Sequence, residues 1–236
     1  MNISIAMATY NSENYILEQL NSFVLQSYKP YELVVCDDVS SDETVNIIKK
    51  FAEQAPFKVR VYKNEKNLGY AKNFELAISR CQGNWIALSD HDDQWFPNKL
   101  EVIAEAINCN PEAKVFIHDY ILTDSNLNPK KWTKMERLRK SGMESSDMIS
   151  GCATVLSRTV IDLVLPIPDY VKSHDTWIHE ITGYFPNFRC VIDKPLMFYR
   201  RHNSNASIAF ESTDKNKSKL NRLLHYKNDT VLENYA

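Results

Sequence analysis

The chain has 236 residues, of which 44% are hydrophobic, so it is long enough for one globular domain with a sizeable core. Its 28 basic and 30 acidic residues give a formal net charge of −2, which excludes a global electrostatic attraction to nucleic acid. The five cysteines show no C-x-x-C spacing, which excludes a zinc knuckle and favours a reducing compartment. With no signal-like start and no run of about 18 apolar residues, we expect a cytoplasmic protein, peripheral to a membrane at most.

Short β-rich segments alternate with longer helical patterns through the first 120 residues. The pattern predicts strands at 3–8, 32–37, 58–63, 85–90 and 114–119, and helices at about 12–27, 42–54, 70–81 and 97–109. This alternation is typical of β-α-β units. We therefore expect an α/β fold with a mostly parallel central sheet that is flanked by helices.

The pattern changes after residue 120. Residues 123–146 are polar and rich in basic side chains, with little apolar periodicity, which predicts a long loop or lid. In the mixed segment that follows, we expect a strand at 148–158, a helix at 174–185 and a strand at 189–201. The tail, residues 212–236, is hydrophilic with a thin apolar stripe and is predicted to form a surface helix.

Polar side chains follow three of the predicted strands. The segment "ATYN" (8–11) follows the first strand, "CDDVSSDET" (36–44) the second and "SDHDD" (89–93) the fourth. In an open parallel sheet the carboxyl ends of the strands meet at one edge, where loop amides and helix N-termini also converge. The sequence therefore predicts a ligand-binding cleft at this edge.

Three carboxylates, Asp90, Asp92 and Asp93, surround His91. Hard oxygen ligands of this kind suit Mg²⁺ or Mn²⁺, which complete their coordination with substrate phosphates and water. An acidic turn that is simply solvated is the alternative. We expect a divalent cation that carries a diphosphate.

The carboxylates behind the second strand allow two interpretations. Asp37, Asp38 and Asp42 precede a predicted helix, where Asp side chains cap free backbone N–H groups. A carboxylate is also an acceptor only, so at a ligand site it selects a donor edge such as the imide N–H of uracil or thymine. The residues alone leave both interpretations open.

Two long segments carry a family resemblance: "ISIAMATYNSENYILEQLNSFVLQSYKPYELVVCDDVSSDET" and "NEKNLGYAKNFELAISRCQGNWIALSDHDDQWFPNKL". Together they resemble the amino-terminal half of the family-two inverting nucleotide-sugar glycosyltransferases, which have the GT-A fold. The resemblance implies one domain over 1–211, with a Rossmann-like nucleotide-sugar-binding half (1–120), a mixed acceptor half (121–211) and then the helical tail. "DHDD" is similar to the "DQDD" of bacterial rhamnosyltransferase-like members, with His91 in place of Gln.

The resemblance also implies roles for residues of the first half. Asp38 corresponds to the carboxylate that reads the pyrimidine base. The turn after the first strand, which frames the base, corresponds to Ala8, Thr9 and Tyr10. The D-x-D signature corresponds to Asp90, which would contact the ribose, and to Asp92, which would bind the metal with Asp93 beside it.

The second half resembles the family over shorter segments. "SHDTWI" implies Asp175 as the catalytic base, and "YRRHNSNAS" implies His202 as a metal or diphosphate contact. Asp175 could instead cap the helix that follows it, and a lone histidine is usually structural. Arg200 and Arg201 could contact phosphate or solvate the end of a strand.

The implied activity is metal-dependent inverting transfer of a sugar from a UDP- or dTDP-sugar to a hydroxyl of a glycan or lipid-linked acceptor, with bacterial surface polysaccharide as a family-level expectation. The basic tail would then rest on an anionic membrane or form a solvated helix.

Three other functions compete with this one. A nucleotidyltransferase acting on sugar phosphates would need a glycine-rich phosphate loop, which this sequence lacks near its first strand. A metallohydrolase could use "HDTWIHE", but His174 and His179 are five residues apart instead of four. A non-catalytic nucleotide-sugar-binding protein would need neither a metal-carboxylate cluster nor a base.

Overall fold

The computed structural model describes residues 1–203 and 205, so the predicted tail helix at 212–236 lies outside the described residues. Residues 1–202 form one compact unit. Within the described residues, no helix has the length and apolarity needed to cross a bilayer.

The strands are β1 (Ile3–Thr9), β2 (Glu32–Asp37), β3 (Lys58–Lys63), β4 (Trp85–Ser89), β5 (Gln94–Trp95), β6 (Val115–Thr123), β7 (Pro129–Thr133), β8 (Thr154–Ser157) and β9 (Arg189–Arg200). The helices are α1 (Ile16–Val24), α2 (Thr44–Ala52), α3 (Tyr70–Arg80), α4 (Lys99–Cys109), α5 (Lys134–Lys140), α6 (Arg158–Val164) and α7 (His174–Gly183). Two 3₁₀ turns, η1 (Ser145–Asp147) and η2 (Gly151–Ala153), precede β8.

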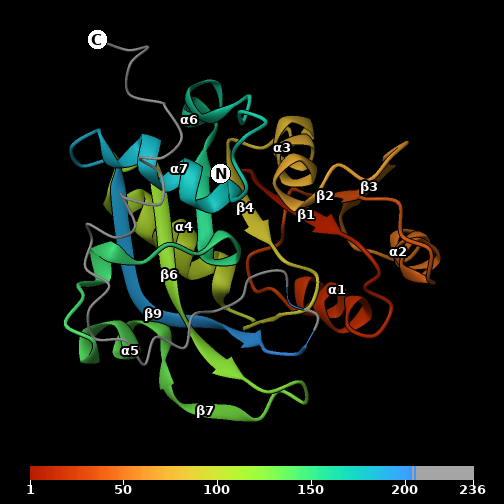
Figure 1. Cartoon of the computed structure of the whole chain (residues 1–236), viewed down its shortest axis with the longest axis horizontal. Coiled ribbons are helices and arrows are strands. Elements are labelled where there is room, and N and C mark those ends of the chain that lie inside the picture. Colours follow the sequence, from red (N-terminus) through yellow and green to blue (C-terminus); the bar gives the residue numbers. More distant parts are fainter. Residues whose placement is uncertain (204, 206–236) are drawn as a thin grey trace. The chain divides into compact units, whose positions relative to one another are not determined.

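One sheet runs through the described part of the chain in the order β3-β2-β1-β4-β8-β6-β9-β5, with β7 paired to β6 (Figure 1). β1 is parallel to β2 and β4, and β2 is parallel to β3. β8 runs antiparallel to both β4 and β6, and β9 is parallel to β6. The carboxyl ends of β1, β2, β4 and β9 therefore face the same edge of the sheet, together with the start of β8.

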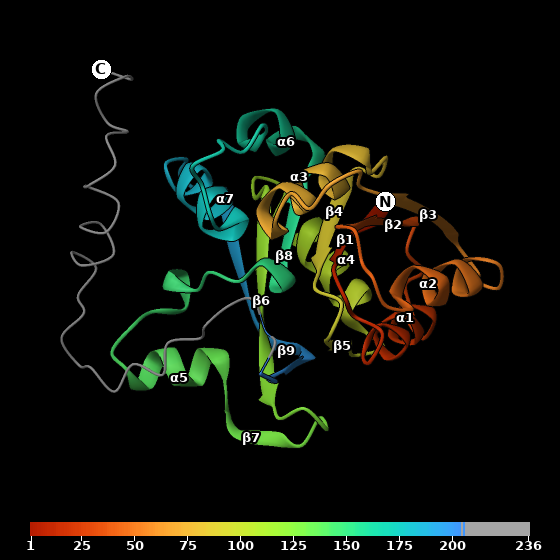
Figure 2. The ribbon, with the colours of Figure 1, turned by 45° about the vertical axis from the view of Figure 1, so that its right-hand side comes forward.

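Two apolar cores cover the two faces of this sheet. Along β1, Ile3, Ile5 and Met7 belong to one core and Ala6 and Ala8 to the other, as the alternation of side chains in a strand requires. Helices α1, α2 and α4 complete the first core, and α3, α6 and α7 complete the second (Figure 2). The predicted α/β fold with helices on both faces is confirmed.

The prediction of a long loop over 123–146 is wrong. The segment contains the short strand β7 and the helix α5. Only two side chains of α5, Met135 and Leu138, are buried, which is too few to produce a visible apolar period. The capping box between Thr133 and Glu136 was the available sequence signal.

The strand predicted at 148–158 is also shorter than expected, because β8 covers only Thr154–Ser157. The residues before it turn toward α7: the backbone N–H of Gly151 donates to Asp175 at 3.1 Å. A Cβ atom at Gly151 would lie 2.5 Å from Nε2 of His174. The apolar pattern could not reveal this close approach of backbone to helix.

Gly83, between α3 and β4, lies against the start of β1. A Cβ atom at Gly83 would lie 2.8 Å from the carbonyl oxygen of Asn2 and 2.8 Å from the backbone nitrogen of Ser4. The Ser4 hydroxyl accepts from Gly83 N at 2.8 Å and donates to the buried carboxylate of Glu32, also at 2.8 Å. The backbones are therefore too close for a side chain at this position.

We expect Gly83→Ala to lower the free energy of unfolding by about 1–3 kcal/mol, because backbone atoms of β1 must move. Gly183→Ala is the matched control, since nothing lies within 4 Å of a Cβ atom at the end of α7. Alanine should be stabilising there by about 0.5–1 kcal/mol. Urea denaturation measures both, and equal effects would contradict the steric explanation.

Candidate active site

The polar segments behind β1, β2 and β4 lie at one edge of the sheet. Thr9 and Asp37, the last residues of β1 and β2, are register partners, and Met7 is the partner of Ser89 in β4. The loop after β4 reaches back toward β1, where Nδ1 of His91 donates to the carbonyl oxygen of Ala8 at 3.3 Å.

Of the three residues expected to form the turn after the first strand, Ala8 and Thr9 are the last two residues of β1, and only Tyr10 follows the strand. Ala8 and Thr9 are buried, and the Thr9 hydroxyl donates to the Asp37 carboxylate at 3.1 Å. Asp37 also accepts the backbone N–H of Ser40 at 2.9 Å, so it closes the turn after β2. Tyr10 is 50% exposed, and its ring is the part of the turn that a ligand can reach.

Asp38 has a different set of partners. Its buried carboxylate accepts the backbone N–H groups of Leu68 at 2.8 Å and Gly69 at 2.9 Å, and the Asn64 amide at 2.9 Å. These donors belong to the connection from β3 to α3, so Asp38 does not cap α2. An ionised carboxylate has about four acceptor positions, which leaves room for one donor of a ligand.

The capping interpretation applies to Asp42. Its carboxylate accepts the backbone N–H of Thr44, the first residue of α2, at 3.0 Å. Asp42 therefore satisfies one of the free donors at this helix start.

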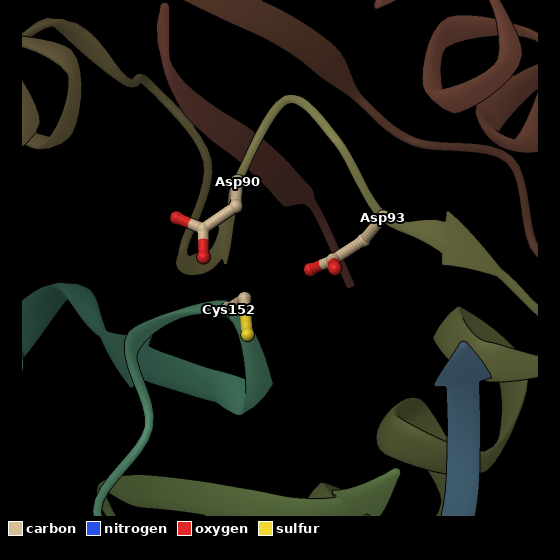
Figure 3. A group of neighbouring side chains, drawn as sticks. All are labelled: Asp90, Asp93 and Cys152. Carbon is tan, nitrogen blue, oxygen red and sulfur yellow. The ribbon is translucent and has the colours of Figure 1, made fainter. Parts of the chain in front are cut away.

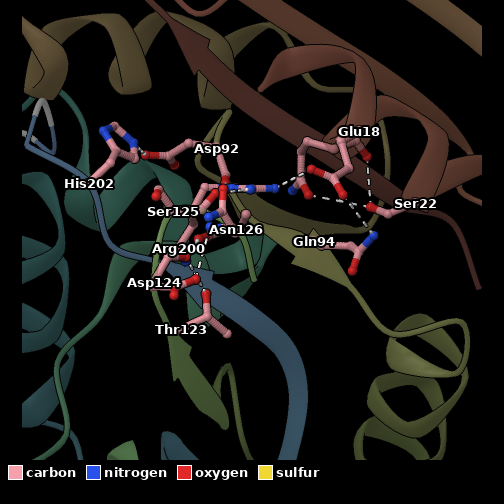
Figure 4. A network of polar contacts seen from close by, with 12 residues as sticks. Glu18, Ser22, Asp92, Gln94, Thr123, Asp124, Ser125, Asn126, Arg200 and His202 are labelled. Carbon is pink, nitrogen blue, oxygen red and sulfur yellow. Dashed lines mark hydrogen bonds and ion pairs between the residues drawn. The ribbon is translucent and has the colours of Figure 1, made fainter. Parts of the chain in front are cut away.

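Asp92 and His202 are in direct contact, although they come from the loop after β4 and the segment directly after β9. Nε2 of His202 lies 2.8 Å from Oδ2 of Asp92 and carries the proton, because a carboxylate only accepts (Figure 4). The His202 ring stacks on Tyr15 at 4.6 Å between centroids. Burial opposes ionisation of Asp92, but the charge of His91 and the His202 hydrogen bond outweigh it and lower the Asp92 pKa.

Asp90 and Asp93 lie near Cys152 of η2 (Figure 3). The ligand atoms of these three side chains all lie within 4.8 Å of one another. Asp93 is fully buried, and its Oδ1 accepts the backbone N–H of Arg200 at 3.1 Å. Its Oδ2 has no hydrogen-bond partner among the described residues. The structure thus divides the acidic segment, with Asp92 at His202 and the other two carboxylates at Cys152.

Asp90 and Asp93 resist ionisation in the protein alone. Burial, followed by the charges of Asp92 and Asp175, raises the pKa of Asp90 to about 7. Burial and the charges of Asp92 and Asp90 raise the pKa of Asp93 well above its ordinary value. A divalent cation would supply the missing positive charge. Carboxylate oxygens with one imidazole and an unpartnered Oδ2 fit Mg²⁺ or Mn²⁺.

A lysine that the sequence pattern did not single out lies beside this cluster. Lys99 of α4 is 1% exposed, and its ammonium group lies 3.6 Å from the centroid of the Trp95 ring. It donates to the carbonyl oxygen of Cys152 at 3.2 Å. Burial lowers the Lys99 pKa to about 7. Its position four residues before the buried Ile103, on the apolar face of α4, was the available signal.

Asp175 lies in the first turn of α7. Its Oδ1 accepts the backbone N–H of Thr176 at 2.8 Å, and its Oδ2 accepts that of Gly151 at 3.1 Å. Burial opposes its ionisation, but the charge of His174 and several hydrogen bonds outweigh it and lower the Asp175 pKa. The charge of Asp175 contributes to the raised pKa of Asp90, so the two carboxylates share one electrostatic environment.

Arg200 connects the acidic loop to its surroundings (Figure 4). Its Nε donates to the carbonyl oxygen of Asp92 at 2.7 Å, and its Nη1 donates to that of Ser125 at 2.6 Å. Its Nη2 pairs with Glu18 of α1. Because Arg200 is only 3% exposed, its guanidinium binds protein groups, which favours a structural role over a phosphate contact.

The two histidines of "HDTWIHE" have separate structural surroundings. His174 stacks on Phe74 at 4.0 Å between centroids, and Nε2 of His179 lies 2.8 Å from the Thr154 hydroxyl. Among the described residues, neither belongs to a group of three side chains placed to bind a metal. This arrangement gives the metallohydrolase alternative no support.

The family model described as "Glycosyl transferase family 2" matches residues 4–165. The chain belongs to glycosyltransferase family 2.

Curated relatives agree with this membership. The chain is 31% identical over 166 residues to the Escherichia coli UDP-Glc:alpha-D-GlcNAc-diphosphoundecaprenol beta-1,3-glucosyltransferase WfgD. This alignment covers 68% of this chain and 62% of WfgD. It is 36% identical over 99 residues to EpsE of Bacillus subtilis, covering 42% of this chain and 36% of EpsE. The chain thus spans less than two thirds of the length of either relative.

Solved structures show the same fold at lower identity. TarS 1–349 of S. aureus, in complex with UDP-GlcNAc, aligns with a TM-score of 0.68 at 22% identity over 87% of this chain and 60% of TarS 1–349. The mannosyltransferase PcManGT of Pyrobaculum calidifontis, in complex with GDP-Man and Mn²⁺, aligns with a TM-score of 0.67 at 18% identity over 86% of this chain and 58% of PcManGT. The predicted GT-A fold of this family 2 glycosyltransferase is confirmed.

We expect Arg200→Gln to lower the free energy of unfolding by about 2–4 kcal/mol, because it removes a buried charged donor together with its ion pair to Glu18. Arg201→Gln, the matched control at the next and less buried residue, should change it by less than about 0.5 kcal/mol. Chemical denaturation of both variants tests this difference. Equal losses would show that the contacts of Arg200 are not what stabilises this edge.

Proposed function

We propose that the chain is a metal-dependent inverting hexosyltransferase. It would move a sugar from a UDP- or dTDP-sugar to a hydroxyl of a glycan or lipid-linked acceptor, in bacterial surface polysaccharide synthesis. The observation that carries this proposal is the gathering of Asp38, Asp90, the Asp92–His202 pair and Asp175 at one edge of the sheet from separate segments of the chain. The "DHDD" segment supports a place in the rhamnosyltransferase-like subgroup.

Similar proteins support the proposed substrate classes. WfgD is named for a UDP-glucose donor and a diphosphoundecaprenol-linked acceptor. The TarS structure contains UDP-GlcNAc, and the PcManGT structure contains GDP-Man with Mn²⁺. These facts concern those proteins, and they are consistent with a nucleotide-sugar donor, a cation and a lipid-linked acceptor for this chain.

The nucleotide would lie along the ends of β1 and β2. Asp38, already held by backbone donors, would accept the imide N–H of the base, since a carboxylate can only accept. The turn formed by Ala8, Thr9 and Tyr10 would frame the base, with the exposed Tyr10 ring as its reachable part. Asp90, one loop away, would contact the ribose.

Asp92 and His202 would hold the Mg²⁺ or Mn²⁺ ion, which would replace the hydrogen bond between them. Asp93 faces Cys152 instead of His202. We keep it as a proposed ligand of the cation because its Oδ2 has no hydrogen-bond partner among the described residues. A bound cation stabilises the negative charge that develops on the leaving diphosphate, which is usually the largest contribution to such a reaction.

Asp175 would act as the general base. Its lowered pKa keeps the carboxylate ionised at neutral pH, so it can accept the proton of the acceptor hydroxyl as that oxygen attacks the anomeric carbon. The backbone N–H groups of Gly151 and Thr176 orient the two carboxylate oxygens. The attack comes from the face opposite the leaving group, so the anomeric configuration inverts without a covalent enzyme intermediate.

We expect EDTA to abolish binding of UDP or dTDP, and Mn²⁺ or Mg²⁺ to restore it, because the acidic residues need a counter-charge. Asp92→Asn should weaken cation-dependent nucleotide binding by about tenfold or more, since it removes a carboxylate ligand. Asp42→Asn should change nothing, because asparagine caps a helix as well as aspartate does. Calorimetry measures all three proteins, and unchanged binding in excess EDTA would contradict the metal site.

Asp175→Asn tests the base separately from the donor site. We expect sugar transfer to fall by roughly 10² or more, with nucleotide affinity nearly unchanged, because the amide cannot accept the proton. If Asp175 only stabilises the start of α7, the asparagine variant should keep most of its activity. Paired turnover and calorimetry distinguish these outcomes, and a fully active variant would remove Asp175 from the mechanism.

A further inference from the structure

The segment from β7 through α5, residues 129–140, concentrates positive charge; we call it the basic hairpin. It has one acidic residue, Glu136, and six basic residues, which are Lys130, Lys131, Lys134, Arg137, Arg139 and Lys140. Its net charge is therefore +5, whereas the whole chain carries −2, so the remaining residues carry −7. The positive charge is therefore concentrated in this one segment, and the net charge of the whole chain does not reveal it.

One side of the basic hairpin packs against the core of the protein. Met135 and Leu138 of α5 are buried in the core. The buried Asp119 of β6 accepts the backbone N–H of Met135 at 3.0 Å, and the capping box of Thr133 and Glu136 completes the helix start. These contacts fix the orientation of α5.

The opposite side of the basic hairpin is exposed. Five of its basic residues have exposed side chains: Lys130, Lys131, Arg137, Arg139 and Lys140. Met135 and Leu138 hold the backbone of α5, and pairing with β6 holds the backbone of β7, so binding need not order the backbone that carries these charges.

Most of this charge is not neutralised by the protein. Arg139 pairs with Asp193 of β9. Within the described part of the chain, Lys130, Lys131, Arg137 and Lys140 have no carboxylate at ion-pairing distance. Like charges held together repel, so an extended negative partner would stabilise them.

An aromatic ring lies among these charges. The ammonium groups of Lys131 and Lys140 lie 4.9 Å and 3.5 Å from the centroid of the Trp132 ring. A half-buried tryptophan flanked by lysines is a combination suited to the boundary between lipid headgroups and water, where the indole has both an apolar body and a polar N–H group.

The basic hairpin is joined to the candidate active site. The turn that leads into it includes Ser125, whose carbonyl oxygen accepts from Arg200 at 2.6 Å, and Arg200 also contacts Asp92. Asp124 tightens this turn by accepting the backbone N–H groups of Asn126 and Asn128, each at 2.9 Å. β7 pairs with the C-terminal part of β6, and α5 lies beside the same part of that strand (Figures 1 and 2).

We propose that the basic hairpin docks on an anionic lipid surface. A single soluble phosphate would engage one or two of these side chains, whereas a surface of lipid phosphates matches a charge that is spread over a strand and a helix. Docking there would place the acceptor side of the site at the membrane. The biological reason for docking rests on the proposed function, because a lipid-linked acceptor resides in that surface. Binding of the basic hairpin to anionic lipid does not depend on the proposed function.

The test is flotation of the full chain with vesicles of phosphatidylcholine containing phosphatidylglycerol, without donor, acceptor or metal. Each lysine near an anionic surface strengthens binding by about fivefold. The triple variant Lys130→Gln, Lys131→Gln, Lys140→Gln should therefore lower the partition coefficient by about a hundredfold. The triple variant to arginine, which keeps the charge, should bind like the parent.

The matched control is Lys49→Gln, Lys50→Gln, Lys58→Gln, which removes the same charge from exposed lysines of α2 and β3. It should keep most of the binding. Equal loss in the two glutamine variants, equal binding to vesicles of pure phosphatidylcholine, or no binding by the parent would each overturn the proposal. Because nucleotide calorimetry is separate from flotation, failure of the docking surface and failure of the proposed transferase function give different results.

Discussion

Repulsion among the carboxylates behind β4 is the constraint on which this edge of the protein depends. Asp90, Asp92 and Asp93 occur within four residues, and two of them have raised pKa values because burial and mutual charge oppose ionisation. The protein places positive or donor groups on each side: His202 at Asp92 and Lys99 beside the other two. These groups come from the segment directly after β9 and from α4, so the surroundings of the acidic loop are completed by three separate parts of the chain.

Because the carboxylates repel one another, elements outside the substrate site are needed to hold the acidic loop in place. Arg200 receives its partners from α1, the loop after β4 and the turn after β6, and its own backbone N–H binds Asp93. In a buried setting each of these hydrogen bonds is stronger than at the surface, and a missing partner is costly. The geometry of the acidic loop is therefore determined by its supports as much as by its own sequence.

The nucleotide half could be predicted from the sequence because its signals are local. Each strand there is a short apolar run, each helix has a clear period, and the polar residues directly follow the strands. In the acceptor half, α7 and β9 agree with the predicted helix and strand, but the segment from 123 to 158 does not, because its features depend on distant contacts. Gly151 turns toward α7 instead of continuing β8, and α5 buries too few side chains to show a period. In the nucleotide half, the sequence pattern did not single out Lys99, because a lysine is seldom fully buried, although this one lies on the apolar face of its helix.

The position of β9 in the sheet has a consequence for folding. β9 lies between β6 and β5, although it is the last strand among the described residues and β5 precedes β6. The segment directly after β9 supplies the imidazole of His202, which contacts Asp92, 110 residues earlier. Contacts of such long sequence separation form late, since the loop-closure entropy must be overcome first. During synthesis, the acidic loop is therefore complete long before its imidazole emerges, so affinity for a divalent cation at this pair would report that the whole sheet has assembled.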